Sequence, residues 1–427
     1  MAQFYDAAVI GGGPAGSTVA TVLARAGRSV VLFEKERFPR FHVGESLLPY
    51  NLPLFERIGV GEKVRAAGFQ QKYGAFFWNE VTGGTRPVAF ERARDDRHPM
   101  AYHVKRADFD QLLLNHSAAC GAVIREETAV RDVLFEEGRA VGVAVRNGAG
   151  AGEEVRAKVI VDASGQTALL SRKLGTRKFD AKLKRAAVFA HYEGVARPAG
   201  KQGGDILLPI DDGVWYWIIP FSDGTASVGA VFDPTVTRGS DGETLEARFE
   251  RLIARSQRMP DLLAGGRRTS KVYGISDYSA ASAKLAGDGY VLVGDAATFL
   301  DPVFSTGVFL GMATGERAAR TIDRALSRHD RVDARDLASY EREANRLFRR
   351  FRRFVYAFYD PVFFEAFCAE NPFEAMRAAV TSVLAGGVEK ISLSEHFWTT
   401  LMMWGIGIDR FRRRLLKIPP PRRETAA

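Results

Sequence analysis

The first thirty residues carry the feature that most constrains the fold. An apolar run, residues 7–10, has the character of a buried strand and leads directly into Gly11, Gly13 and Gly16. Residues 17–26 then follow with helical spacing. In a G-x-G-x-x-G turn the first glycine permits the tight turn, the second lets a pyrophosphate approach the backbone, and the third lets the helix pack on the strand. The segment therefore predicts a Rossmann-like dinucleotide-binding fold.

An acidic residue stands where such a fold needs one. Residues 29–33 predict a second strand, and Glu34 follows it, 23 positions after Gly11. A carboxylate there can accept hydrogen bonds from a ribose. A glycine-rich turn with no nucleotide leaves Glu34 unexplained. We therefore expect a pyrophosphate on the N-terminus of the first helix, with Ala15 in the same phosphate turn.

Composition limits the class of protein without choosing a function. The 427 residues are enough for two or three domains, and 46% hydrophobic with 26% charged residues is ordinary for a globular protein. The net charge of +9 favours acidic partners but does not choose among nucleic acid, membrane surface and acidic protein. Cys120 and Cys368 show no metal-ligand spacing, so no metal site is expected. The first apolar run ends in glycines, and no run suffices for a membrane span; we expect a cytoplasmic protein.

Three further stretches favour FAD over NAD as the dinucleotide. Each stretch combines a predicted buried strand or turn with charged or small residues. The three stretches are residues 40–49, 158–175 and 289–308. The second stretch has a strand that ends in Asp162, and the third has one that ends at Asp295, which is placed to hydrogen-bond a ribityl chain. The helix after Pro302 would direct its positive N-terminus at the flavin. Together the stretches resemble the flavoprotein monooxygenases typified by aromatic hydroxylases.

That resemblance implies a discontinuous FAD-binding domain. Arg106 matches the arginine that this class places beside the flavin, although a surface arginine at a helix start is an alternative reading. Arg40, Ser46 and Val308 complete the expected cofactor site. The fold class is α/β: a Rossmann-like FAD-binding domain, a β-sheet substrate domain and a helical C-terminal segment. The expected ranges are 1–70, 101–175 and 271–330 for the FAD-binding domain, 71–100 and 176–270 for the substrate domain, 331–410 for the helical segment, and 411–427 for a basic tail.

Within that class the chain resembles the flavin-dependent halogenases. WYWIIP, residues 215–220, matches their W-x-W-x-I-P motif, Lys72 matches their active-site lysine, and FLDPVFSTGV, residues 299–308, matches their flavin and chloride segment. The resemblance implies that FAD, supplied reduced by a separate flavin reductase, reacts with dioxygen and with chloride held near Thr306 and Gly307. The hypochlorous acid produced would reach Lys72, which delivers the chlorine to an aromatic ring.

The two tryptophans and the lysine each have a plainer reading. Trp215 and Trp217 face the same way on a strand, with Tyr216 and Ile218 opposite. The resemblance implies a wall that keeps the substrate from the flavin, whereas aromatic residues at this spacing commonly pack in a core. Lys72 could likewise be an ordinary exposed lysine. Its apolar and small neighbours favour a strand that lines a cavity.

One departure from the family pattern bears on the substrate. Halogenases of free tryptophan carry a glutamate before the S-T-G triplet, and Phe304 occupies that place here. The absence of this glutamate favours a substrate ring that is already activated, a phenol or a pyrrole. The ring could be free or tethered to an acidic carrier protein. The alternatives from other classes are a reductase of the geranylgeranyl reductase type, an aromatic hydroxylase, and a flavin-binding scaffold without catalysis.

The C-terminal third changes in character. Residues 340–359 interleave arginines with phenylalanines, a pattern that can indicate nucleic-acid binding. Because the aromatic residues recur every three or four positions, we favour a helix that buries one face, and we expect no nucleic-acid partner. This segment is expected to cover the substrate end of the site.

Overall fold

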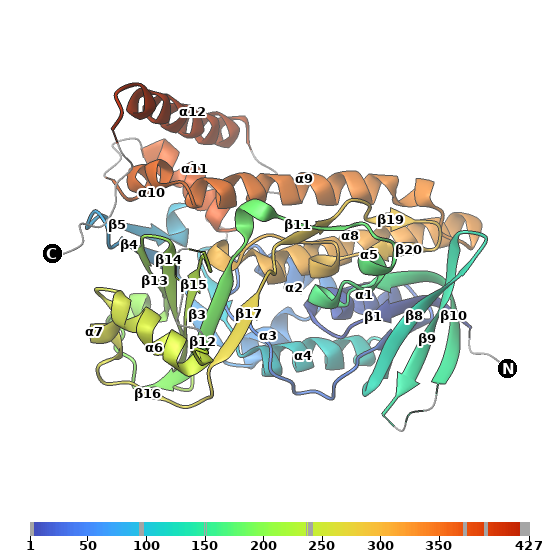
Figure 1. Ribbon diagram of the computed structural model, residues 1–427. Helices are drawn as coiled ribbons and strands as arrows, with labels where there is room; N and C mark the ends of the chain where they lie inside the picture. Colours follow the sequence, from blue (N-terminus) through green and yellow to red (C-terminus); the bar gives the residue numbers. More distant parts are fainter. Residues whose placement is uncertain are drawn as a thin grey trace.

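The protein is described here by a computed structural model, with helices laid over two large sheets (Figure 1). The structure describes residues 4–418 except 94–97, 149, 151, 236, 238–241, 370–373 and 388–391.

The first large sheet is the predicted nucleotide-binding sheet. Its parallel strands lie in the order β20 (Tyr290–Leu292), β10 (Gly152–Asp162), β1 (Phe4–Ile10), β2 (Val30–Phe33) and β7 (Val123–Arg125). Short β19 (Ala286–Gly287) and the hairpin of β8 (Thr128–Glu136) and β9 (Arg139–Asn147) extend it in antiparallel fashion. The central strands are apolar runs because helices cover both faces of such a sheet. Since β20 and β1 share one sheet, the expected discontinuous FAD-binding fold is confirmed.

Helices from distant parts of the chain pack on this sheet. Helix α1 (Pro14–Arg25) contacts both α8 (Thr306–His329) and α4 (Arg106–Ala119). The α1–α8 contact is close because glycines lie in it: a Cβ at Gly315 would stand 2.8 Å from the carbonyl oxygen of Ala15. Three shorter helices complete this part: α2 (Asn51–Ile58), α3 (Gly61–Ala66) and α5 (Leu169–Lys173).

The second large sheet is antiparallel over most of its width. Its order is β16 (Arg267–Arg268), β12 (Ala186–Glu193), β15 (Thr225–Phe232), β14 (Val214–Pro220), β13 (Ile206–Asp211), β4 (Gly74–Asn79) and β5 (Thr85–Ala89). Helices α6 (Leu245–Arg255) and α7 (Met259–Leu263) lie beside it (Figure 1). Strand β17 (Tyr273–Ser276) also pairs with β12, so this sheet extends past residue 270, where the sequence placed the return to the FAD-binding domain. After α7 the chain returns to β12, and the backbone of residues 273–276 pairs with it before the chain re-enters the FAD-binding domain.

The motif WYWIIP forms most of the buried strand β14. Trp215 and Trp217 pack in the large core shared with the first sheet, whereas Tyr216 and Ile218 pack in a separate core that includes Phe249 of α6. The predicted alternation of faces is therefore confirmed.

Two small sheets join the large ones. A ribbon of β3 (Gln70–Lys72) and β6 (Ala101–His103) carries the candidate lysine. Strands β11 (Arg177–Phe179), β18 (Ala280–Ser282) and β21 (Thr298–Phe299) form the other.

The C-terminal segment is helical, as predicted. Its helices are α9 (Ala334–Phe358), α10 (Pro361–Cys368), α11 (Glu374–Leu384) and α12 (Leu393–Leu415). All four phenylalanines of α9 between positions 348 and 358 are buried, as expected for a helix that packs by one face. Helix α12 runs past residue 411, so the start of the predicted tail is helical, and residues 419–427 lie outside the described residues. Among the helices described, none has the length and apolar content to cross a membrane.

The third glycine of the turn gives a test of the packing. A Cβ at Gly16 would stand 1.9 Å from the carbonyl oxygen of Gly11, whereas one at Gly13 would meet only the Arg40 guanidinium at 3.6 Å. We expect Gly16→Ala to lower the free energy of unfolding of the flavin-free protein by about 3 kcal/mol, because α1 must move off β1. Gly13→Ala, at the N-cap of α1, is the matched control and should change it by no more than about 1 kcal/mol. Denaturant unfolding measures both, and equal values for the two variants would contradict this account.

Candidate active site

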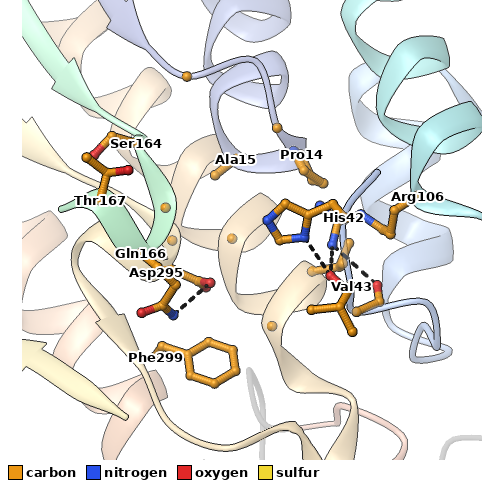
Figure 2. A pocket seen from close by; sticks show the side chains of 18 of the residues that line it. Pro14, Ala15, His42, Val43, Arg106, Ser164, Gln166, Thr167, Asp295 and Phe299 are labelled. Carbon is orange, nitrogen blue, oxygen red and sulfur yellow. Dashed lines mark hydrogen bonds between the residues drawn. The ribbon is translucent and has the colours of Figure 1, made fainter. Parts of the chain in front are cut away.

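A cavity of about 520 Å³ gathers most of the residues that the sequence singled out. Figure 2 shows part of its wall, with the turn at Pro14 and Ala15, the loop at His42 and Val43, and Asp295 around one space. Of the predicted residues, the lining includes Gly11, Gly13, Ala15, Glu34, Arg40, Ser46, Arg106, Trp215, Trp217, Asp295, Pro302, Gly307 and Val308. Gly16 is buried behind them, where it supports the turn.

The nucleotide end of the cavity has the shape and charges that FAD requires. Helix α1 begins at Pro14, and no side chain caps its first turn, so its N–H groups are available to a pyrophosphate. The space at Gly13 is open. The buried carboxylate of Glu34 accepts hydrogen bonds from the backbone N–H of Gly12 at 2.8 Å and of Glu36 at 3.0 Å, which hold it at the cavity wall. The residues present therefore fit the dinucleotide.

A buried ion cluster fixes Arg106 in the wall. Its guanidinium donates two hydrogen bonds to the carboxylate of Asp110, at 2.7 and 2.9 Å, and one to the carbonyl oxygen of Val43 at 2.8 Å. Arg40 donates to the same carboxylate at 3.0 Å. Two cations thus share one fully buried anion beside the cavity. The alternative reading of Arg106 as a surface arginine is wrong, because the residue is only 7% exposed.

Asp295 also lines the cavity and has a partner that the sequence did not reveal. Burial raises the pKa of its carboxyl to about 6. The side-chain amide of Gln166 donates to this carboxyl at 3.2 Å (Figure 2), and Arg177 donates to the amide oxygen of Gln166 at 3.0 Å. Gln166 lies in the turn after the strand that ends at Asp162. This position in a turn at the edge of the sheet was the one sequence feature that could have marked it as a site residue. These contacts hold the Asp295 carboxyl at the cavity wall, and its contact with FAD stays a prediction.

Asp162 itself lies behind the wall. Its carboxylate is fully buried and accepts hydrogen bonds from the backbone N–H groups of Ser164 at 3.0 Å and Leu170 at 2.7 Å. It therefore holds the turn that carries Gln166, and its direct contact with FAD stays a prediction.

The two tryptophans form part of the same cavity wall. Their ring centroids are 5.8 Å apart, and the indole N–H of Trp217 donates to the hydroxyl of Ser227 at 3.1 Å. Gly229, opposite Trp217 on β15, leaves room for the ring: a Cβ there would stand 2.3 Å from it. The core reading of the pair is confirmed because both rings are buried, and both also line the cofactor cavity; their role as a wall between substrate and flavin stays a prediction.

A hydrogen-bonded chain ties this wall to the predicted chloride segment. The indole N–H of Trp215 donates to the hydroxyl of Tyr359 at 3.0 Å, and that hydroxyl donates to the carboxyl of Asp301 at 2.8 Å. Asp301 also accepts from the N–H of Val303 at 3.0 Å and so caps the short helical turn Pro302–Phe304. Burial raises the pKa of Asp301 to about 6. Sequence reasoning missed this chain, because Tyr359 comes from the far end of α9.

The N-terminus of α8 faces the cavity at Gly307. Its N-cap, Ser305, has φ +56° and offers no side-chain cap, so the first N–H groups of α8 are available to an anion. Of the two predicted halide residues, Gly307 lines the cavity, whereas Thr306 is buried and outside the lining. Both assignments stay predictions.

Lys72 is buried next to the cofactor cavity and outside it. Its amino group donates to the hydroxyl of Ser46 at 2.9 Å and to the carbonyl oxygen of Leu47 at 3.2 Å. Burial lowers the pKa of Lys72 to about 7, so ammonium and amine coexist near neutral pH. The reading as an exposed lysine is wrong, because the residue is 2% exposed.

A second, small cavity of about 20 Å³ adjoins this amino group. Lys72 and Phe304 line it, together with Leu384 of α11, so the C-terminal segment does cover this end. Ser305 and Ile206 line both cavities and therefore form the partition between them. Trp215 and Trp217 lie on the cofactor side of this partition, away from Phe304.

An unpredicted histidine accompanies the lysine. His103 pairs with Gln70 in the β3–β6 ribbon, so its side chain shares a face with Lys72. Burial holds the pKa of His103 well below its usual range, and the Lys72 cation lowers it further. A neutral imidazole therefore stands near the amino group.

Comparison with known proteins decides the family. Residues 5–355 match the FAD binding domain family. The 1H-pyrrole-2-carbonyl-[peptidyl-carrier protein] chlorinase of Pseudomonas fluorescens is 34% identical over 349 residues, which cover 76% of this chain and 77% of that protein. The chain belongs to the flavin-dependent halogenases.

Other relatives agree. The tryptophan 2-halogenase of Chondromyces crocatus is 33% identical, over 82% of this chain and 67% of that protein. The solved structure of the myxobacterial chondrochloren halogenase is 34% identical with a TM-score of 0.79, covering 94% of this halogenase and 97% of that chain. The enzyme is thus an FAD-dependent halogenase, and the reductase, hydroxylase and scaffold alternatives are not supported.

The buried amino group of this halogenase predicts a pH dependence of stability. The pKa of Lys72 is about 7 in the folded protein and about 10.4 in an unfolded chain, so between these values the unfolded state binds more protons. The contribution of Lys72 to the free energy of unfolding therefore rises with pH across this window, by on the order of 4 kcal/mol. Denaturant unfolding is measured for wild type and Lys72→Met from pH 7 to pH 10. The free energy of unfolding of wild type minus that of Lys72→Met should rise across this range. Lys178→Met, at an exposed position, is the control, and a flat difference for Lys72→Met would contradict a buried amine.

Proposed function

We propose that this halogenase uses reduced FAD, dioxygen and chloride to chlorinate an electron-rich aromatic ring by way of hypochlorous acid and Lys72. The observation that carries the proposal is the position of the lysine: buried, with a pKa of about 7, beyond a partition from the cofactor cavity. A group in that position can act on a small oxidant that leaves the flavin without meeting the flavin itself.

Bound reduced FAD would supply the reaction in which dioxygen and chloride become hypochlorous acid and water. The protein's part in that step is binding and exclusion. Glu34, Arg106 and Asp295 would hold the cofactor, and the N–H groups of α8 near Gly307 would hold chloride. Trp215 and Trp217 would occupy the space in which an aromatic ring could otherwise reach the flavin.

Lys72 would then transfer the chlorine in one of two ways. As an ammonium it donates a hydrogen bond to hypochlorous acid and increases the positive character of the chlorine. As an amine it forms an N–Cl bond and releases water, and the ring then takes the chlorine and loses a proton. Because its pKa is about 7, both forms are available. The same pKa suits a group that must change its protonation during turnover.

Phe304 is the basis for the proposed substrate class. It lines the small cavity beside Lys72 and makes an edge contact with Phe358, with ring centroids 5.5 Å apart. A carboxylate in this apolar place would be costly to bury without a partner. A phenol or pyrrole needs no such group, because its own heteroatom directs the electrophile.

We further propose that the ring is presented on an acidic carrier protein and that a separate flavin reductase supplies the reduced FAD. The Pseudomonas fluorescens relative is a chlorinase of a pyrrole carried on a peptidyl-carrier protein. The net charge of +9 on this chain suits an acidic partner. A cytoplasmic location, where both partners would be available, is part of the same proposal.

The lysine is tested by product formation. We expect Lys72→Ala to lower chlorinated product by a factor of at least about 10², the scale of a lost acid–base group, while oxygen consumption by the reduced flavin continues. Lys72→Arg separates the two routes, because a guanidinium donates hydrogen bonds but is a poor chlorine acceptor. Lys201→Ala, at an exposed position, is the control. Product from Lys72→Ala near the wild-type rate would refute the proposed function.

The substrate class is tested by competition. Reduced FAD and chloride are supplied with tryptophan, a substituted phenol and a pyrrolyl group, the last both free and carrier-tethered. We expect product from the pyrrole or phenol and none from tryptophan, including with Phe304→Glu. Mass spectrometry identifies the products, and a parallel run with bromide reads the halide preference. Preferred chlorination of tryptophan would overturn the inference from Phe304.

A further inference from the structure

The last helix presents a continuous apolar stripe to solvent. The large side chains of α12 that are 40–71% exposed recur at intervals of four, three, four, three and four residues. They are Phe397, Leu401, Trp404, Ile408, Phe411 and Leu415, called here the α12 stripe. An apolar row of this length on one side of a helix is unusual for a surface that stays in water.

The opposite face of α12 is already packed against the protein. Glu395, Thr399 and Ile406 are buried there, and Arg413 forms a salt bridge with Glu365 of α10 at 2.9 Å. Figure 1 shows α12 as the outermost helix of the C-terminal segment, beyond α10 and α11. Because the inner face is held in this way, the stripe cannot turn inward to join the core.

The spacing of the stripe selects the shape of its partner. Alternating intervals of three and four residues make a narrow seam of the kind that packs against another helix. A helix that lies on a membrane surface instead has a broad apolar face and cationic residues along its polar face. In α12 the face opposite the stripe, which includes Ile406, is docked on α10 and α11, and the arginines, at positions 410 and 412–414, are confined to the end of the helix.

We propose that the α12 stripe pairs in antiparallel fashion with the α12 stripe of a second copy of this chain. The two-fold axis would cross the stripe at the level of residue 406 along the helix. The stripe is symmetric about that position, since 404 and 408, 401 and 411, and 397 and 415 are each equidistant from 406. Each copy would therefore present Trp404 to the partner's Ile408 and Leu401 to the partner's Phe411. Such self-complementarity is what a two-fold interface requires.

Two exposed glycines at the centre support close approach of a second helix. Gly405 and Gly407 flank the axis, and each costs an exposed helix about 1 kcal/mol relative to alanine. A Cβ at either position would meet nothing within 4 Å in this chain, so packing within the protomer does not require glycine there. Gly405 and Gly407 lie on the two flanks of the seam beside Trp404, where the lack of side chains makes room for the indole rings of a pair.

Charge favours the antiparallel direction over the parallel one. The exposed Arg412 and Arg414 lie near one end of α12. A parallel pair would bring both cationic ends to about 10 Å, the usual distance between packed helices. In the antiparallel pair the two copies of Arg414 would be separated by 16 residues of rise, about 24 Å, well beyond the Debye length of about 8 Å in physiological salt.

The stripe exposes a large apolar area that a pair would bury. Phe397, Trp404 and Phe411 are 57%, 71% and 69% exposed, and an aromatic side chain buries about 150–250 Å² when fully covered. These three therefore offer roughly 300–500 Å² per copy. The aliphatic members of the stripe, Leu401, Ile408 and Leu415, are 40%, 59% and 70% exposed and add to this area, toward the roughly 800 Å² per partner of a standard interface.

The first experiment measures mass in solution on the full chain loaded with FAD. Sedimentation equilibrium should give a dimer for wild type at about 10 µM and a dissociation constant at least a hundredfold higher for Trp404→Glu/Ile408→Glu. Phe179→Glu, at a position of β11 that is 57% exposed, is the matched control and should stay dimeric. A wild-type monomer at 100 µM, or a dimer that survives the double substitution, would overturn the proposal.

A glycine variant guards against loss of folding as an explanation. Gly405→Leu should raise or preserve the unfolding temperature of the protomer, because leucine favours helix and its side chain has open space. The same variant should weaken the dimer at least tenfold, because the side chain would keep the helices apart. A Gly405→Leu protein that dimerises as tightly as wild type would contradict the interface.

Cross-linking tests the direction of pairing. Leu401→Cys and Phe411→Cys are made in chains with different tags, and mild oxidation of their mixture should give a disulfide between the two tags. Neither variant alone should cross-link in the antiparallel pair, whereas each alone would do so in a parallel pair. Wild type, with Cys120 and Cys368, is the blank. Binding of monomers to anionic phospholipid vesicles, or a one-to-one complex with an acidic carrier domain through α12 in place of self-association, would overturn the proposal in favour of that partner.

Discussion

Ala15 is the point on which the arrangement of the site depends. Its methyl group and backbone are approached by glycines from the opposite segment: a Cβ at Gly294 would stand 3.0 Å from the Ala15 Cβ, and one at Gly315 would stand 2.8 Å from its carbonyl oxygen. This absence of side chains lets α8 lie directly on α1. The N-termini of both helices consequently open into one cavity, where each can stabilise negative charge. A larger residue at any of these positions would separate the two halves of the cofactor site.

The site separates two kinds of chemistry by a thin partition. On one side, fixed carboxylates, arginines and helix termini suit a large anionic cofactor, and two indoles close the wall. On the other side, a buried lysine stands among apolar side chains. Ser46 connects the sides, since it lines the cofactor cavity and accepts a hydrogen bond from Lys72. Asp301 and Tyr359 connect the wall to the C-terminal helices. A reactive small molecule made on one side could thus be used on the other without exposure of the flavin to the ring.

Residues that act through local sequence were predicted well. The glycine turn, Glu34 and the alternation of β14 depend on spacing within a few residues, and the structure places each as expected. The role of Lys72 came from the family resemblance, because its apolar and small neighbours suggested a cavity but could not show which side chains its amino group would meet. Gln166, His103 and Tyr359 were missed, since their partners lie between about 30 and 140 positions away in the chain. The hydrophobic periodicity of a sequence carries no information about contacts between residues so far apart.

The sequence by itself determined the α/β class, the dinucleotide turn, the face on which the tryptophans lie and the amphipathic C-terminal helix. These follow from steric and hydrophobic rules that operate along the chain. Only the tertiary structure decided that Lys72 is buried, that Asp162 supports a turn behind the wall, that β17 joins the second sheet and that one face of α12 stays uncovered. Burial and pairing depend on what the rest of the chain brings to each residue: Lys72 meets Ser46 from another segment, and β17 pairs with β12 after the chain has passed through α6 and α7.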